Sequence, residues 1–248
     1  MLDQKSLLLR GYVSPADFKD AKDALQKAVD LASALDIRKV VVTEDIASDA
    51  PVVLPSSTHL VIAGASVFAD LMTEKTESVS FESECVYIEG RDGGTLAGSI
   101  LLYNGARCVI EGLAVTGDVS LYFIKGARLE DVRVGGRLTL GRGTANAIVQ
   151  HVAGDFCAID SGVAEKDVLG KEPTVRSLVL RESRFDSGVT AVAAPDYGLL
   201  NVQIDGISAN VTVGDGNTAV GADAYFNLTV KEITGDVTVL SPTKNLTL

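Results

Sequence analysis

The chain has 248 residues, of which 22 are Lys or Arg and 33 are Asp or Glu, so its formal net charge at pH 7 is −11. This charge disfavours nucleic acids and anionic lipid headgroups as partners, because both bind basic surfaces. Hydrophobic residues make up 46% and charged residues 22%, as in a globular chain, and no apolar run is long enough to be inserted into a membrane. The 24 glycines and the low aromatic content of 5% favour an all-β fold with frequent turns.

Neither the first residues nor the cysteines indicate export. Residues 1–5 are mostly polar and no long apolar segment of a signal peptide follows. We therefore expect a cytoplasmic protein, or a surface or virion protein whose leader was removed or whose export is unconventional. Cys85, Cys108 and Cys157 form an odd, sparse set without CxxC spacing, so we expect them to be unpaired and buried as small apolar side chains.

The sequence predicts one helix, over residues 14–36. Ser14 is placed to cap the first free amides, Pro15 suits the first helical position, and Asp17 completes a variant capping box. Apolar residues then recur at steps of three and four on one face, namely Phe18, Ala21, Leu25, Ala28, Val29, Ala32 and Leu35. An amphipathic helix in front of an all-β body needs an apolar surface to cover. We expect this helix to cap the end of that body, and the alternative is a partner-binding helix.

After Gly98 a short phrase returns, in which an alternating strand, a bend of Gly, Asp or Asn, and a second alternating strand follow one another. Clear copies begin at Leu113, Val132, Val152, Ile207 and Ile233. The first three of these positions are evenly spaced, the last two lie somewhat further apart, and the long gap between Val152 and Ile207 holds two coils and an insertion. Repeats with a period of about 20 residues and no second helix exclude ankyrin, TPR and HEAT arrays.

The consensus of leucine-rich repeats and the hexapeptide rhythm of left-handed β-helices are also missing. The sequence therefore predicts a right-handed parallel β-helix of about eight to ten coils, capped at its N-terminal end by the helix. The whole chain, 1–248, is expected to be one domain, with the coils over 37–248.

Four asparagines share one position in the repeat. Asn146, Asn201 and Asn227 each stand six residues before a leading apolar residue, and Asn245 begins a phrase like that of Asn227 near the end of the chain. We interpret them as a ladder in which side-chain amides hydrogen-bond from coil to coil, and the alternative is that they are independent turn residues.

Three segments near the start of the chain resemble the entry into the pectate lyase-like right-handed β-helix superfamily. They are the helix over 14–36, the strand-like Lys39-Val-Val-Val-Thr43, and the phrase Ser57-Thr-His-Leu-Val-Ile-Ala-Gly-Ala-Ser66. In that superfamily a helix caps the first coil, and a strand and a phrase of this type follow. The resemblance implies the architecture of nearly the whole chain but no particular activity, because the superfamily includes enzymes, tail spikes, adhesins and proteins with no known catalysis.

The sequence lacks the catalytic phrases of the best-known enzymes of that superfamily. Polygalacturonase-like members carry Asn-Thr-Asp, Asp-Asp, Gly-His-Gly and Arg-Ile-Lys, and none of these occurs here. No clear carboxylate cluster for the Ca²⁺ of pectate lyase-like members stands out, so we expect no cofactor, and Ca²⁺ only if the chain is lyase-like.

The nearest assemblage of catalytic residue types is Asp155, Asp160, Arg184 and Asp186, scattered over adjacent coils. A pair of these acids one or two coils apart would be within the range that glycosidases use. Asp155 also follows a Gly bend, where an Asp suits the turn itself, so a structural role is the alternative.

The insertion over residues 161–174 lengthens one coil by about a dozen residues, and such loops often shape the binding surface of a solenoid. We expect Arg181 and Glu182 to lie near its base, with Asp160 and Arg184, as candidate ligand-binding residues. The alternative is a solvated loop without a ligand.

The two histidines predict no metal site, because a zinc site needs three or four ligands with workable spacing. His59 lies near the cap. His151 precedes Val152, which we expect to point inward, so His151 is expected to point outward.

The last residues, 245–248, predict a strand with no polar cap after it. An open end of a β-helix exposes unpaired backbone and apolar interior, which favours association. We expect either a homo-oligomer formed through this end or a longer natural chain.

The sequence thus favours a non-catalytic β-helix that presents a surface for carbohydrate or protein binding, in the manner of a spike, adhesin or other surface protein. The missing catalytic phrases favour this function, and the absence of Trp counts against a sugar site because sugars stack on aromatic rings. One alternative is a lyase or glycoside hydrolase acting on an acidic polysaccharide. Another is a polymer-forming scaffold like the bactofilins, which the Thr-Gly-Asp-Val phrases resemble, although uneven coils and a capping helix disfavour a filament.

Overall fold

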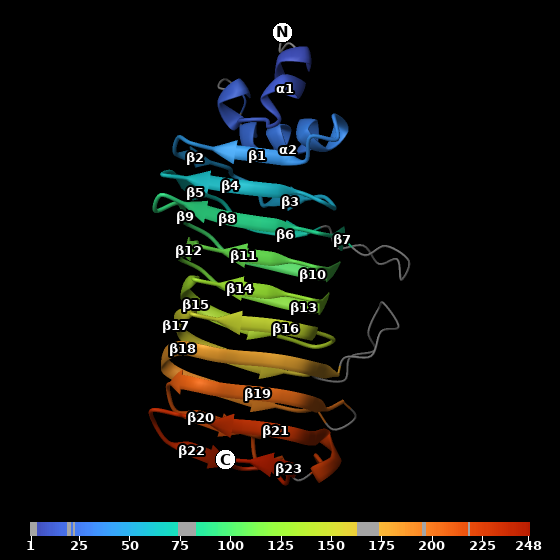
Figure 1. Ribbon diagram of the computed structural model, residues 1–248, viewed down its shortest axis with the longest axis vertical. Coiled ribbons are helices and arrows are strands. Elements are labelled where there is room, and N and C mark those ends of the chain that lie inside the picture. Colours follow the sequence, from blue (N-terminus) through green and yellow to red (C-terminus); the bar gives the residue numbers. More distant parts are fainter. Residues whose placement is uncertain are drawn as a thin grey trace.

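The repeated alternation of inward apolar and outward polar residues winds the chain into a right-handed parallel β-solenoid of about 8 turns, stacked along one axis (Figure 1). This computed structural model describes residues 4–18, 21, 23–73, 83–162, 174–194, 197–217 and 219–248. All pairs of named strands in these ranges run parallel, which confirms the predicted fold class. Most of the predicted insertion, namely residues 163–173, lies outside the described residues.

The coils form three parallel sheets. The first sheet stacks β1 (Lys39–Val42), β4 (His59–Ala63), β8 (Tyr87–Arg91), β11 (Val109–Glu111), β14 (Arg128–Glu130), β16 (Ala145–Gln150), the first part of β18 (Val175–Val192), β19 (Leu199–Ser208), β21 (Tyr225–Lys231) and β23 (Lys244–Thr247). The second sheet stacks β2 (Ile46–Ala47), β5 (Ser66–Phe68), β9 (Thr95–Leu96), β12 (Ala114–Val115), the first parts of β15 (Arg133–Leu140) and β17 (Ala153–Asp160), and the middle of β18.

The third sheet stacks β3 (Val52–Leu54), β6 (Leu71–Thr73), β10 (Ile100–Ala106), β13 (Val119–Lys125), the last parts of β15, β17 and β18, and then β20 (Val211–Val213) and β22 (Val237–Val239). The short strand β7 (Ser83–Glu84) pairs with the end of β10. Long strands such as β18 therefore pass around the bends and take part in more than one sheet.

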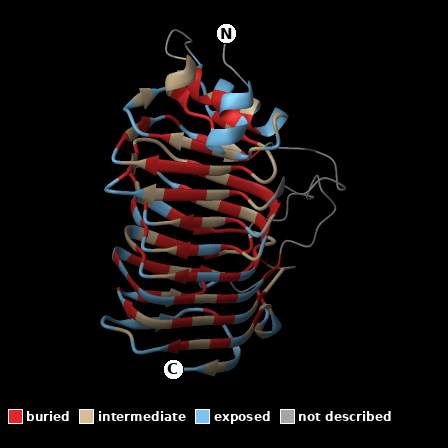
Figure 2. Cartoon of the chain, turned by 45° about the horizontal axis from the view of Figure 1, so that its top comes forward, coloured by how far each residue is buried: buried red, intermediate tan, exposed pale blue. Residues whose placement is uncertain are grey.

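One column of apolar side chains runs through the interior. Colouring by burial shows that the strands of the stacked coils carry many buried residues (Figure 2). Leu113, Val132 and Val152, the leading residues of the predicted repeat, are all buried in it. On the next coil the same position is taken by Ser183, whose Oγ accepts a hydrogen bond of 3.0 Å from the backbone N–H of Val152. Ile207 then restores the apolar pattern. The repeat is thus continuous across the insertion.

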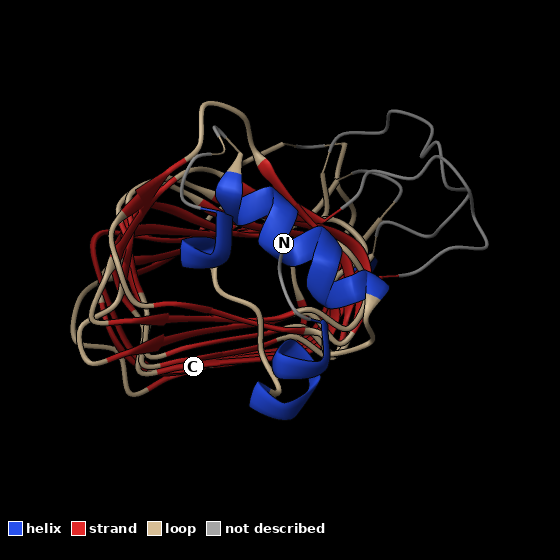
Figure 3. Cartoon of the chain, turned by 90° about the horizontal axis from the view of Figure 1, so that it is seen from above, coloured by secondary structure: helices blue, strands red, loops and turns tan. Residues whose placement is uncertain are grey.

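A helix covers the N-terminal opening of the solenoid, as predicted. α2 (Ala24–Ala34) crosses the opening when the molecule is seen from above, and it contacts β1 and β3 (Figure 3). The side chains it buries there include Leu25 and Val29. This packing supports the role of an end cap.

The prediction of one continuous helix over 14–36 is wrong in its extent. The expected capping box does form: the Ala16 N–H donates to Ser14 Oγ at 3.3 Å, and the Ser14 N–H donates to Asp17 Oδ2 at 2.9 Å. It begins a separate 3-10 helix, η1 (Pro15–Phe18). Two backbone hydrogen bonds here join residues three apart, as in a 3-10 helix. The Asp17 N–H donates to the Ser14 carbonyl and the Ala21 N–H donates to the Phe18 carbonyl, and this tighter winding separates the segment from α2.

A further helix, α1 (Gln4–Arg10), was not predicted. It has only seven residues, and Leu7 is its one buried residue, so it lacks the repeating apolar face that marks a helix in a sequence. Leu8 and Leu9 are 57% and 82% exposed. The remaining helix, η2 (Ala222–Ala224), is a single turn before β21. In the described part of the chain, no helix is both long and apolar enough to cross a membrane.

The asparagine ladder is present over the C-terminal coils. Asn227 Nδ2 donates to Asn201 Oδ1 at 3.0 Å, and Asn245 Nδ2 donates to Asn227 Oδ1 at 2.9 Å. All three residues have a φ between 55° and 60°, in the left-handed region that Asn tolerates better than most residues. The register puts Ser177 between Asn146 and Asn201, so one coil separates Asn146 from the ladder.

The cysteines are unpaired, as expected. Cys108 and Cys157 are buried and Cys85 is half-buried. Burial raises the pKa of the Cys108 thiol to about 11, and burial also raises the pKa of Cys157. Both thiols therefore serve as small packing groups in the core.

Candidate functional site

Three of the four predicted catalytic candidates line one groove on the second sheet. The groove has a volume of about 360 Å³ and is lined by Arg133, Val134, Gly135, Ala153, Gly154, Asp155, Arg184 and Asp186. Asp155, Arg184 and Asp186 come from β17 and β18, and all three side chains are exposed. The sequence pattern thus located neighbours on adjacent coils, and their chemical role stays a prediction.

The groove exists because a small residue lies between two arginines. Arg133, Ala153 and Arg184 occupy the same register position on β15, β17 and β18, with Ala153 in the middle. The backbone also bulges on either side, since the pairing shifts after Val134 and after Gly154. The groove therefore has the small side chain of Ala153 at its floor, between the guanidinium groups of Arg133 and Arg184.

Close backbone packing leaves no space for a side chain at Gly135, on the edge of the groove. A Cβ there would lie 2.5 Å from the carbonyl oxygen of Thr116 on the coil before. A Cβ at Gly154 would lie 3.1 Å from the carbonyl oxygen of Val134 on the coil before and 3.5 Å from the buried ring of Phe185 on the next coil. The two glycines therefore let adjacent coils pack closely beside the groove.

The charges of the groove are only partly paired. Arg184 binds Asp186, with Nε to Oδ1 at 2.8 Å, and Ser187 Oγ donates to Asp155. Among the described residues, Arg133 makes no side-chain hydrogen bond or ion pair. The groove therefore offers one unpaired guanidinium, and each of its two carboxylates keeps one oxygen available.

The other predicted residues lie elsewhere. Asp160 ends β17 at the start of the insertion, where its Oδ1 accepts a hydrogen bond of 2.7 Å from the Gly162 N–H. Arg181 and Glu182 were expected near the base of the insertion, but they lie six and seven residues after Val175, which begins β18. At about 3.3 Å per residue, that separation is roughly 20 Å. They belong to a different surface, on the first sheet.

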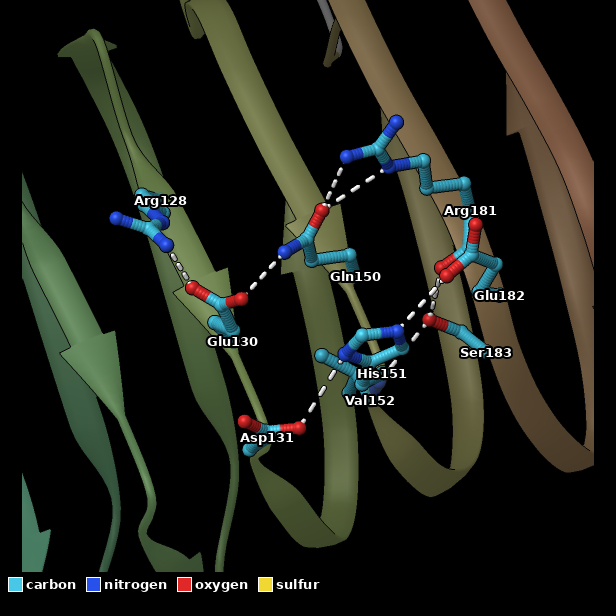
Figure 4. Close-up of polar contacts among 9 residues, drawn as sticks. All are labelled: Arg128, Glu130, Asp131, Gln150, His151, Val152, Arg181, Glu182 and Ser183. Carbon is cyan, nitrogen blue, oxygen red and sulfur yellow. Dashed lines mark hydrogen bonds and ion pairs between the residues drawn. The ribbon is translucent and has the colours of Figure 1, made fainter.

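That surface carries two parallel rows of polar side chains (Figure 4). In one row, Gln150 donates to Glu130 Oε1 at 2.5 Å and accepts hydrogen bonds from Arg181, with Nε at 3.0 Å. Arg128 on β14 pairs with the other oxygen of Glu130. Because parallel strands bring equivalent positions into stacks, residues 130, 150 and 181 lie on successive coils.

In the second row, His151 lies between two acids from the neighbouring coils. Its Nδ1 is 3.3 Å from Asp131 Oδ1, and its Nε2 is 2.8 Å from Glu182 Oε2. Asp131 and His151 directly follow β14 and β16, Glu182 lies within the long strand β18, and all three have a φ near +50°. The outward orientation predicted for His151 is confirmed, since 47% of its side chain is exposed.

The other histidine also pairs with an acid across coils. His59 Nε2 is 3.0 Å from Glu89 Oε2, and its ring stacks on Tyr87 with a centroid distance of 4.3 Å. Burial of Glu89 would raise its pKa, but hydrogen bonds from Arg91 and His59 outweigh this and lower it. His59 thus has one carboxylate partner, whereas His151 has two.

A second hollow, of about 310 Å³, lies between the cap and the first coil. It is lined by η1 and its flanks and by residues 42–47, among which Glu44 and Asp45 are acidic. Among the residues that the structure describes, no Arg, Lys or His lines it. The groove on the second sheet is therefore the stronger candidate for a ligand, because it combines both signs of charge.

Fold and surface together define a parallel β-solenoid protein with charged sites on its flat sides. No protein-family model matches the chain, and no curated protein matches it in sequence. Membership of the pectate lyase-like superfamily therefore stays an expectation.

Solved structures that are similar to the chain include the surface protein and adhesin PfbA of Streptococcus pneumoniae. One structure of PfbA has a TM-score of 0.48 and 10% identity, over 95% of this chain and 98% of that chain. A second, described as a crystal structure of this surface adhesin, has a TM-score of 0.46 and 9% identity, over 96% and 93%.

Proposed function

We propose that this protein is a non-catalytic β-helix that binds an acidic polysaccharide in the groove on the second sheet. The observation that carries the proposal is the unpaired guanidinium of Arg133, facing Arg184 across the floor formed by Ala153. A guanidinium binds a carboxylate or sulfate with two parallel hydrogen bonds, which makes it the side chain of choice for an anionic sugar.

The acids of the groove complement this recognition. Asp155 and Asp186 each keep a carboxylate oxygen that accepts a hydrogen bond from a sugar hydroxyl. The groove crosses three successive coils of the second sheet, from β15 over β17 to β18, which suits a linear polymer better than a small molecule. Because the chain carries a net charge of −11, the attraction is local to the groove, and binding is expected to weaken as salt rises.

The partners of the two acids favour binding over hydrolysis. Ser187 donates to Asp155, and Arg184 forms an ion pair with Asp186. A glycosidase needs one carboxylic acid that is protonated and can donate a proton to the leaving group. In the groove, both acids instead accept hydrogen bonds through Oδ1, from Ser187 and from Arg184.

Affinity electrophoresis of the full chain in gels containing polygalacturonate, alginate or neutral dextran tests the proposal. We expect retention by an acidic polymer and not by dextran. Arg133→Ala should weaken binding by about 10-fold or more, the size of a lost charged hydrogen bond. Arg176→Ala removes an exposed arginine from the first sheet and is the matched control, which should bind like the wild type.

The outcomes separate the alternatives. Equal losses in Arg133→Ala and Arg176→Ala, or no retention by any polymer, would refute a site in this groove. New reducing or unsaturated ends, measured after incubation with and without Ca²⁺, would replace the proposal by the lyase or hydrolase alternative. Filaments in electron micrographs would favour the bactofilin-like alternative, which the cap formed by α2 disfavours by closing one end.

A further inference from the structure

Both ring nitrogens of His151 face carboxylate oxygens. Nε2 lies 2.8 Å from Glu182 Oε2, and Nδ1 lies 3.3 Å from Asp131 Oδ1 (Figure 4). A neutral imidazole has one N–H donor and one lone pair, whereas a carboxylate offers only lone pairs. One of the two contacts therefore sets lone pair against lone pair, unless a second proton or a metal cation lies between the atoms.

The distances indicate which contact has the proton. The 2.8 Å separation between Nε2 and Glu182 is that of a good hydrogen bond to a carboxylate, and we therefore assign the ring proton to Nε2. Nδ1 then presents its lone pair to Asp131. Metal-binding histidines have this arrangement, in which one nitrogen binds the ion and the other donates to a carboxylate that fixes the ring.

We propose that Nδ1 of His151 and the carboxylates of Asp131 and Glu130 bind one divalent transition-metal ion, with Zn²⁺ the best fit. Ligand atoms of these three residues lie within 4.8 Å of one another. Two ligands about 2.1 Å from a tetrahedral Zn²⁺ are separated by about 3.4 Å, and Nδ1 and Oδ1 are already at 3.3 Å. One imidazole and two carboxylates suit Zn²⁺, Mn²⁺ or Co²⁺ better than the thiolate-seeking Cu⁺.

The surrounding residues hold these ligands in place. Gln150 donates to Glu130 Oε1 at 2.5 Å, and Arg128 binds its other oxygen. Arg181 in turn fixes the amide of Gln150. Such outer contacts orient ligating carboxylates and are a usual part of a metal site. Glu182 and Gln150 are thus positioning residues, and they do not touch the ion.

The site is open to an ion from solvent. On the coils that flank the row of Asp131, His151 and Glu182, glycine takes the same bend position. Gly112 is aligned with Asp131 on the coil before, and Gly206 is aligned with Glu182 on the coil after. The side chains of Asp131 and His151 are 68% and 47% exposed. Three protein ligands with free space beside them leave room for water to complete the coordination, as in sites with an open position.

Calorimetric titration of the untagged full chain with Zn²⁺, after EDTA treatment and dialysis, tests the proposal. A parallel titration with Co²⁺ reads the geometry from its visible absorption. We expect one ion per chain. His151→Gln and Asp131→Asn should weaken binding about 100-fold or more, and Glu182→Gln about 10-fold to 100-fold. His59→Gln, which removes the histidine with one carboxylate partner, is the matched control and should bind like the wild type.

Three results would overturn the site. The first is a wild-type chain that takes up neither ion, which would mean that a second proton bridges His151 and Asp131. The second is unchanged binding in both His151→Gln and Asp131→Asn. The third is a loss in His59→Gln equal to that in His151→Gln, which would mean that the acidic surface binds ions without a defined site. Circular dichroism checks that each variant folds, and Asp131→Asn carries the test if His151→Gln does not.

Discussion

Replacing Asn227 tests how much the asparagine ladder stabilises the solenoid. The side chain donates to Asn201 and accepts from Asn245, and its φ is 55°. Asn227→Ala removes both hydrogen bonds and puts a β-carbon into the left-handed region. Asn227→Gly removes the same bonds but adopts that φ without strain. The two variants therefore separate the contribution of the side chain from that of the backbone.

The structure sets the expected magnitudes. A hydrogen bond contributes about 0.5–1.5 kcal/mol, and because both bonds are exposed we take about 0.5 kcal/mol each. A left-handed conformation costs an ordinary residue about 1–2 kcal/mol. Glycine avoids this cost. Its greater conformational freedom in the unfolded chain, however, lowers the free energy of unfolding by about 0.4–1 kcal/mol. We expect Asn227→Ala to lower the free energy of unfolding by about 2–3 kcal/mol, and Asn227→Gly by about 1 kcal/mol less.

Urea unfolding monitored by circular dichroism measures both differences, with a constant m-value as the check that the unfolded state is unchanged. Solenoid coils contact only their neighbours, so hydrogen exchange should accelerate in β21 and not in β4. Equal losses in the two variants would refute the backbone argument. Wild-type stability in both variants would show that the ladder does not stabilise the fold.

Two further predictions concern acid stability and association. The hydrogen bonds that lower the pKa of Glu89 below its ordinary 4.5 stabilise the fold above that pH, and this stability is lost as the pH falls through the lowered value. At pH 7, Glu89→Gln should therefore unfold at a lower urea concentration than the wild type, whereas at pH 2 the two midpoints should agree. An equal difference between the midpoints at both pH values would contradict this prediction. The last coil exposes Val239 and Leu240, so we expect this chain to pair with a second copy there. Light scattering should show a dimer that Leu240→Lys dissociates, and a wild-type monomer at high concentration would contradict it.

The sequence was sufficient for those features that depend on local periodicity. Inward residues such as Leu113 and Val132 recur at nearly constant intervals, and parallel stacking turns that interval into a register. Asn201 and Asn227 share an offset for the same reason. The break between η1 and α2 was not predictable from periodicity, because Phe18 and Leu25 fit one apolar face whether or not the helix is continuous between them.

The candidate sites were predictable only where the register is regular. In the sequence, Asp155 and Asp186 each belong to a short bend that contains Gly and Asp, and these bends mark neighbouring coils, so their meeting in one groove follows from the repeat. On the coil that carries Asp186, the leading position is taken by Ser183, a polar residue whose Oγ accepts a hydrogen bond from the Val152 N–H. The insertion also comes shortly before this residue in the sequence. Without an apolar marker there, the match of Glu182 with His151 could not be recognised in the sequence.

Each surface site is built from one residue per coil, so its geometry depends on the register and not on a local motif. Asp131 and Glu182 are far apart in sequence, yet both contact the His151 ring because their coils flank the coil that carries it. A one-residue deletion in a strand of one coil would turn its outward side chains inward and remove its contribution to the column. The strands on either side of the long connection between β17 and β18 remain in register with their neighbours. Strands therefore constrain both sites strongly, whereas the bends tolerate changes in length, and this explains why uneven coils still align His151 with both acids.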